Sequence, residues 1–137
     1  MTLSRETRLS IETFEAGALD SAEFDHAAHI YVAWLYLQRF PAATAISRFT
    51  EGLRRLTARL GVPGKYHETI SWFYMLLIAE RIAGASTKNW DAFCQDNDDL
   101  FRRDDNVLGR YYSDNLLGSD LARQSFVLPD KIVAQAA

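Results

Sequence analysis

Apolar residues recur three and four positions apart over most of the chain, the spacing that predicts α-helices with one buried face. The clearest case follows Pro41, a residue suited to the first turn of a helix. The apolar positions there form a single stripe, which consists of Ala42, Ile46, Phe49, Leu53, Leu56 and Leu60. Gly61 predicts the end of this helix, and residues 62–64 predict a turn.

Two further long helices are expected, one on each side of this segment. The earlier one begins near residues 21–24, and its inward stripe contains His26, His29, Ile30, Ala33, Leu37 and Phe40. The later one begins near residues 65–68 and runs to about Ala83. Because this later helix is apolar nearly all round, we expect it to contact several other helices.

The sequence predicts shorter helices before and after these three long ones. Ser4 is a candidate cap for a first helix that Gly17 ends, and Thr87 is a candidate cap for a helix just after it. Further short helices are expected near residues 98–103, 107–116 and 119–126. The predicted fold is therefore all-α: a single domain over residues 1–137, built as a compact bundle of about five to seven helices, with an irregular tail from 129 to 137.

Composition and charge narrow the classes of function. Of the 137 residues 48% are hydrophobic, enough for a core without disulfide or metal staples. The net charge of −3 argues against a nucleic-acid-binding protein. Cys94 is the single cysteine and fits a reducing compartment, and the longest apolar run, residues 72–79, is far shorter than the ~20 residues of a membrane span. We expect a cytoplasmic protein that binds neither nucleic acid nor membrane; the sequence leaves a homodimer open.

The candidate chemistry centres on three histidines and one glutamate. His26 and His29 lie three residues apart on the inward stripe of one helix, which makes their side chains neighbours. His67 and Glu68 begin the helix that is apolar nearly all round. An ionisable group in a buried first turn needs a partner, because an isolated buried charge is costly. We therefore expect the two helix starts to lie side by side, with the imidazole rings converging.

Three convergent imidazoles are the ligands of a transition-metal site that keeps a position open for water or substrate. In this interpretation His26, His29 and His67 are the metal ligands, and the ion is zinc, iron or copper. Glu68 is a further ligand or the catalytic acid/base beside the metal. The first functional hypothesis is a small metal-dependent enzyme, an oxygenase or a hydrolase, that acts on a small molecule.

The competing hypothesis uses the same residues without a metal. Glu68 would bond to His26 or His29 in a structural hydrogen-bond network that holds two helices in register. The protein would then be a non-catalytic helical module that binds a small molecule or a partner. Polar groups at helix starts also satisfy free backbone N–H groups, which is why the sequence leaves both hypotheses open.

Other side chains are candidates for contact with a substrate or ligand, and they are Tyr66, Trp72, Arg81 and Tyr112. Two of them have a competing structural interpretation. Arg81 is also expected to form an ion pair with a buried acid such as Glu15. Tyr112 is also expected to lie in the core.

Four segments resemble a bacterial family of small helical proteins without an established activity. The segments are Phe24-x-His26-x-x-His29, Lys65-Tyr66-His67-Glu68-Thr69-Ile70, Tyr111-Tyr112-Ser113 and Ala122-Arg123-x-x-Phe126-Val127-x-Pro129-Asp130. The match extends over about residues 14 to 130. This resemblance implies that the two histidine segments belong to one site, and it implies no reaction.

Overall fold

The computed structural model describes residues 9–86 and 89–131, and all regular secondary structure in that part of the chain is helical. Seven α-helices and three short 3₁₀ helices follow one another there. In chain order they are α1 (Ile11–Glu15), α2 (His26–Arg39), α3 (Ala42–Arg59), η1 (Pro63–Lys65), α4 (Glu68–Ala83), α5 (Trp90–Asp96), η2 (Asp98–Phe101), η3 (Val107–Arg110), α6 (Asp114–Leu117) and α7 (Asp120–Gln124). The predicted all-α single domain is confirmed.

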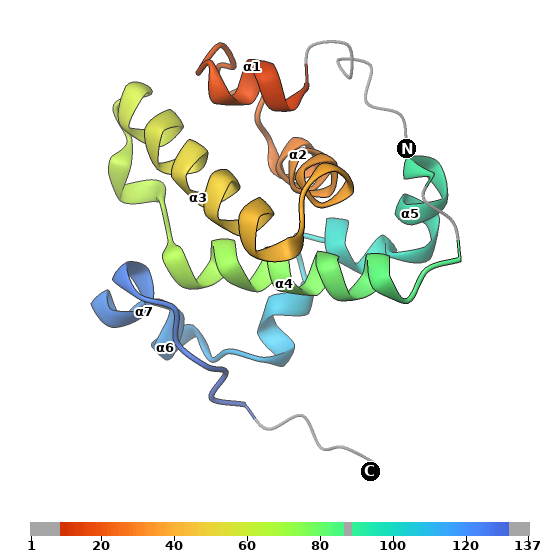
Figure 1. Cartoon of the computed structure of the whole chain (residues 1–137). Helices are drawn as coiled ribbons and strands as arrows, with labels where there is room; N and C mark the ends of the chain where they lie inside the picture. The colour runs from red at the N-terminus through yellow and green to blue at the C-terminus, as the bar shows by residue number, and fades with distance from the viewer. Residues whose placement is uncertain (1–8, 87–88, 132–137) are drawn as a thin grey trace.

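Helix α4 is the centre of the bundle (Figure 1). It contacts α2, α3 and α7. Helices α1, α2 and α3 lie on one side of it, whereas α6 and α7 lie on the other (Figure 1). The prediction that this helix contacts several others is therefore confirmed, and its apolar surface on nearly every side is the reason.

The two helices that carry the histidines begin with side-chain caps. Asp25 precedes α2 and accepts a hydrogen bond from the backbone N–H of Ala28 through Oδ1 at 2.9 Å. His67 precedes α4 and accepts one from the N–H of Ile70 through Nδ1 at 3.2 Å. Such caps satisfy the N–H groups that the first turn of a helix leaves free. Helix α2 thus begins later than expected from residues 21–24, because Asp25 is the effective cap.

The residues that cap the shorter helices differ from those expected from the sequence. Ser10 caps α1, in a reciprocal arrangement with Thr13, and Asn89 caps α5. The predicted caps Ser4 and Thr87 lie outside the described residues. Gly61 ends α3 in the left-handed region at φ +77°, as predicted, and the turn after it returns the chain directly to α4.

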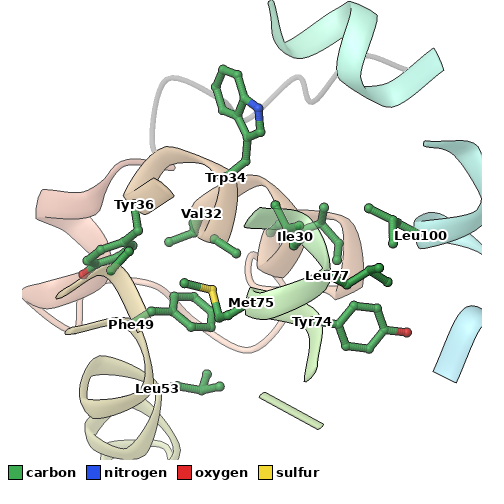
Figure 2. Packing of buried hydrophobic residues seen from close by; sticks show 14 of the residues in the cluster. Ile30, Val32, Trp34, Tyr36, Phe49, Leu53, Tyr74, Met75, Leu77 and Leu100 are labelled. Carbon is green, nitrogen blue, oxygen red and sulfur yellow. The ribbon is translucent and has the colours of Figure 1, made fainter. Parts of the chain in front are cut away.

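The core lies between α2, α3 and α4 (Figure 2). Its fully buried large side chains include Ile30 and Tyr36 from α2, Phe49 from α3, and Met75 and Ile78 from α4. Burying each apolar side chain of this size contributes about 1.5–3 kcal/mol to folding. The contacts among these three helices fix where α2 and α4 begin, and so they place the histidines.

The buried face of α2 is wider than the predicted stripe. Val32 and Tyr36 are fully buried, although neither belongs to that stripe, whereas Leu37 and Phe40 are only partly buried. The reason is that α1, α3, α4 and η2 all pack against α2. A helix covered on several sides buries more than one face.

The C-terminal third is built from short pieces rather than from the longer helices expected there. The first of the expected segments, 98–103, contains only the 3₁₀ helix η2, which ends at Phe101. The second contains η3 and α6, and the third contains α7. The described part of the predicted tail, 129–131, has no regular structure, and it is held by Asp130, which accepts a hydrogen bond from the N–H of Ser113 at 2.8 Å. No helix among residues 9–86 and 89–131 is long and apolar enough to cross a membrane.

Candidate functional site

His67 uses both ring nitrogens in hydrogen bonds. Its Nδ1 accepts from the backbone N–H of Ile70, so this nitrogen carries no proton. Its Nε2 lies 2.8 Å from the carbonyl oxygen of Leu117, and because a carbonyl only accepts, Nε2 carries the proton and donates it. The ring is 8% exposed. His67 is therefore a neutral, fully bonded imidazole that ties the start of α4 to the end of α6.

His26 is the first residue of α2, and its ring is also anchored. Nε2 lies 2.8 Å from the carbonyl oxygen of Leu100 in η2, so this nitrogen is again the donor. The ring meets the edge of Tyr74 with 5.7 Å between the ring centroids. These contacts fix the ring between η2 and α4.

His29 has a different environment. Its ring lies between two aromatic rings, with centroid distances of 5.5 Å to Phe24 and 5.1 Å to Phe49. Its Nε2 is buried and has no hydrogen-bond partner among the described residues. Burial and, to a smaller extent, the electrostatic effect of His26 lower the pKa of His29 to about 4. The ring is therefore neutral at pH 7, and one of its nitrogens is an unsatisfied polar atom.

A pocket of about 300 Å³ opens beside His29, and we call it the His29 pocket. Helices α2, α3 and α4 and the connections before α2 and before α4 supply its walls. The lining residues are Ser21, Phe24, His29, Leu53, Leu56, Thr57, Leu60, Val62, Lys65, Tyr66, His67, Ile70 and Ser71. Its inner wall is mainly aliphatic and aromatic, and exposed Ser21 and Lys65 mark the mouth.

The three imidazole rings do not meet at one point. His29 and His67 line the His29 pocket, but His26 lines a separate depression on the other side of Ile70, which lines both. Within the part of the chain that the structure describes, no group of three or more histidine, cysteine, aspartate or glutamate side chains is arranged to hold a metal ion. The two helix starts thus lie near each other, as expected, but the rings are anchored to different carbonyl groups.

Glu68 bonds to neither histidine. Its Oε1 accepts a hydrogen bond from the hydroxyl of Tyr66 and forms an ion pair with Arg54 at 2.9 Å. The guanidinium of Arg54 also stacks over the ring of Tyr66, 5.0 Å from its centroid. Burial raises the pKa of Tyr66, and the hydrogen bond to Glu68 raises it further. The partners of Glu68 are therefore Arg54 and Tyr66, where the structural-network hypothesis expected His26 or His29.

Four other side chains were expected to contact a substrate or ligand. Of these, Tyr66 lines the His29 pocket and the other three do not. Trp72 packs beside Phe126 on the far side of α4, with 6.0 Å between the ring centroids. Tyr112 is 1% exposed, and its hydroxyl donates to the carbonyl oxygen of Val127 at 2.7 Å. Its place in the core, the competing interpretation, is confirmed.

Arg81 forms the expected ion pair, but the predicted acid was wrong. Its guanidinium binds both carboxylate oxygens of Asp99, at 3.0 and 2.9 Å, and also donates to Asn97 at 2.7 Å. Glu15 binds Arg48 and accepts from the hydroxyl of Tyr36. The sequence offered no basis for choosing Asp99, because η2 was not placed relative to α4 by any apolar repeat.

Sequence reasoning missed much of the pocket wall. Leu53, Leu56 and Leu60 belong to the clear apolar stripe of α3 and were expected only to fill the core. A usable signal was the short turn at residues 61–64, which places the end of this stripe beside the start of α4. Lys65 at the mouth is exposed, and no periodic sequence pattern pointed to it.

Comparisons of the chain with models of protein families, with curated proteins and with solved structures find no match. The resemblance to a bacterial helical family therefore stays a prediction.

Proposed function

We propose that this protein is a binding module for a small, mostly apolar molecule that occupies the His29 pocket. The observation that carries the proposal is the buried Nε2 of His29, which lacks a hydrogen-bond partner among the described residues although its ring lines a pocket. Leaving such a group unpaired costs about 1–3 kcal/mol. Because this nitrogen has almost no accessible surface, a polar group of a ligand reaches it when the neighbouring side chains shift slightly, and the bond then removes the cost.

The walls define the chemistry of the ligand. A volume of about 300 Å³ is at the small end of ligand pockets, so the ligand has the size of a single ring or a short aliphatic chain. Leu53, Leu56 and Phe24 offer apolar contact. A neutral imidazole offers one donor and one acceptor, which suits a hydroxyl, a carbonyl or a protonated acid.

The hydrogen bonds around the pocket support binding over catalysis. His67 is held by Ile70 and Leu117, and Tyr66 is held by Glu68, so two wall residues are fixed before any ligand enters. Pre-organised walls reduce the entropy that is lost on binding. In this function the histidine cluster is mainly structural, and His29 alone is left for the ligand.

A titration with small probes tests the proposal. Indole, benzyl alcohol and cyclohexanol are added separately, and the backbone amide signals are followed by NMR. We expect saturable shifts at His29, Leu56 and Ile70 for at least one probe. No saturable shift at these residues with any probe would contradict a ligand pocket of this size and polarity.

A pair of variants on α3 localises the binding. Thr57 lines the pocket and is partly buried, whereas Ala58 next to it is exposed. Thr57→Trp is expected to fill part of the pocket and weaken binding about tenfold, a change of about 1.4 kcal/mol. Ala58→Trp should bind as the parent does. Equal affinity in both variants would place the probes elsewhere.

Metal content separates this proposal from the metal-dependent enzyme. A metal ion on His67 requires that the ring gives up its bond to Leu117 or to Ile70. The protein, purified without an affinity tag, is analysed for zinc, iron and copper before and after refolding with each ion. Stoichiometric metal that is lost in both His29→Ala and His67→Ala would favour the enzyme, while less than about 0.2 ion per chain would favour the binding module.

A further inference from the structure

A second depression lies at the start of α2, and we call it the Tyr74 pocket. Its volume is about 260 Å³, and its lining residues are His26, Ile70, Tyr74, Arg102, Arg103, Asn106 and Leu108. Ile70 separates it from the His29 pocket, because this side chain lines both. The two pockets differ in character: apolar side chains dominate the first, and basic and hydrogen-bonding side chains dominate the second.

Tyr74 gives this pocket an unpaired hydroxyl. The residue is only 6% exposed, yet its hydroxyl makes no hydrogen bond to any residue in the described part of the chain. Figure 2 shows the oxygen pointing away from the core, at the edge of the cluster. The ring itself is held by His26 and Phe73. The structure therefore aims a fixed hydrogen-bond donor at the depression.

Two arginines line the depression beside this hydroxyl. Arg103 is exposed and forms no ion pair with a residue of the described part of the chain. Arg102 has one partner, Asp98, at 3.2 Å on the surface. Helix α2 has 14 residues and begins at His26, so its positive dipole end lies at the same place, with the N–H of Ala28 already bonded to Asp25.

Two carboxylates near the depression already have partners. Asp99 binds Arg81, and Arg110 approaches the same carboxylate at 3.7 Å. Asp25 is held by the N–H of Ala28. None of the described residues that line the Tyr74 pocket is acidic. An anion that enters it therefore meets donors and cations without a lining carboxylate.

We infer that the Tyr74 pocket binds a small oxyanion, a carboxylate or a phosphate group. The Tyr74 hydroxyl donates one hydrogen bond to it, Arg103 supplies the charge, and the positive dipole end of α2 adds to the attraction. Arg103 is an exposed lining residue on a loop, whereas Tyr74 is fixed on α4. This site is independent of the ligand proposed for the His29 pocket, since Ile70 lies between them.

The test is an NMR titration of the folded protein with sodium phosphate and, separately, with sodium acetate. Ionic strength is held constant with sodium chloride, and pH is held at 7. We expect saturable shifts of the amide signals of His26 and Ala27 and of the Arg103 side-chain Nε–H signal. The anion that saturates at the lower concentration identifies phosphate or carboxylate as the preferred group.

Three variants decide whether these side chains form the site. Tyr74→Phe keeps the ring contacts and removes the donor, and Arg103→Gln removes the charge. Each is expected to weaken the preferred anion about fivefold or more, as for a lost charge-assisted or neutral hydrogen bond. Arg39→Gln, at the other end of α2, should leave the affinity unchanged. Shifts that stay linear for both anions, or equal affinity in the parent, Tyr74→Phe and Arg103→Gln, would overturn the inference.

Discussion

The imidazole of His67 donates a hydrogen bond to the carbonyl oxygen of Leu117 across 50 residues of sequence, at 2.8 Å. The same ring caps α4 by accepting from Ile70. One side chain therefore satisfies a helix start and a helix end in different parts of the chain. Because the ring is 8% exposed, water does not readily replace either bond.

Replacing His67 by alanine is expected to lower the free energy of unfolding by about 1–3 kcal/mol, because both partners become unpaired. Urea denaturation followed by circular dichroism measures this change. His67→Asn is the matched control, since asparagine also caps helices but does not have the reach of the imidazole. It should recover part of the loss. An alanine variant as stable as the parent would show that the two bonds are replaced at no cost.

His29 makes the stability depend on pH. Its pKa is about 4 in the folded protein because burial disfavours the charged ring, against an ordinary value of 6.5. Between these values the unfolded chain binds more protons than the folded one, so stability falls as pH falls from about 6.5 to about 4. The free energy of unfolding that His29 contributes above pH 6.5, and that is lost as pH falls toward 4, is up to roughly 3 kcal/mol.

Urea denaturation at several pH values between 7 and 4.5 checks this dependence in the parent and in His29→Leu. Leucine keeps an apolar side chain in the aromatic environment and cannot titrate. The variant should lose less stability than the parent over this range, and the difference isolates His29 from the other ionisable groups. Parallel curves for the two proteins would mean that the ring of His29 is charged or solvated in the folded state.

Much of the fold follows from apolar spacing. Apolar residues recur every three to four positions over residues 42–60, so the length and end of α3 were predictable from the sequence. The C-terminal third was less predictable because η2, η3, α6 and α7 are at most five residues long. Elements this short have too few turns for a periodic pattern, and their positions depend on contacts such as that between Arg81 and Asp99.

The candidate site was predictable in position but not in geometry. Helical spacing placed His26 and His29 on one helix and His67 at the start of another, and the structure brings these helix starts together. The direction of each ring depends on which carbonyl lies nearby, Leu100 for one and Leu117 for another. Both carbonyls belong to short C-terminal elements, so no local pattern around the histidines encodes them.

Gly52 marks a close approach between α3 and α1. A Cβ at this position would lie 2.5 Å from Cε2 of Phe14, a ring that is 1% exposed and stacked against Phe24 and Phe49. Gly52→Ala is therefore expected to destabilise the protein by about 1–3 kcal/mol through overpacking, although alanine is the better helix former. Thermal unfolding measures the change.

Gly64→Ala is the control for this substitution, because nothing lies within 4 Å of a Cβ built there and its φ is not positive. We expect its stability to stay within about 0.5 kcal/mol of the parent. If Gly52→Ala were as stable as Gly64→Ala, the ring of Phe14 would have room to move, and the contact between α1 and α3 would be looser than the structure shows.

The ion pair of Arg81 with Asp99 joins the end of α4 to η2. Both carboxylate oxygens are bound, and the hydrogen bond from Arg81 holds the pKa of Asp99 below its ordinary value. The side chains are 26% and 19% exposed, so water screens the pair only in part. In a double-mutant cycle with Arg81→Met and Asp99→Asn we expect a coupling of about 1 kcal/mol, measured by urea denaturation.

Arg110→Met is the control, since Arg110 reaches the same carboxylate at 3.7 Å from a half-exposed position, and its coupling should be near zero. Equal couplings for the two arginines would mean that charge alone, rather than the two-oxygen contact, holds η2 against α4.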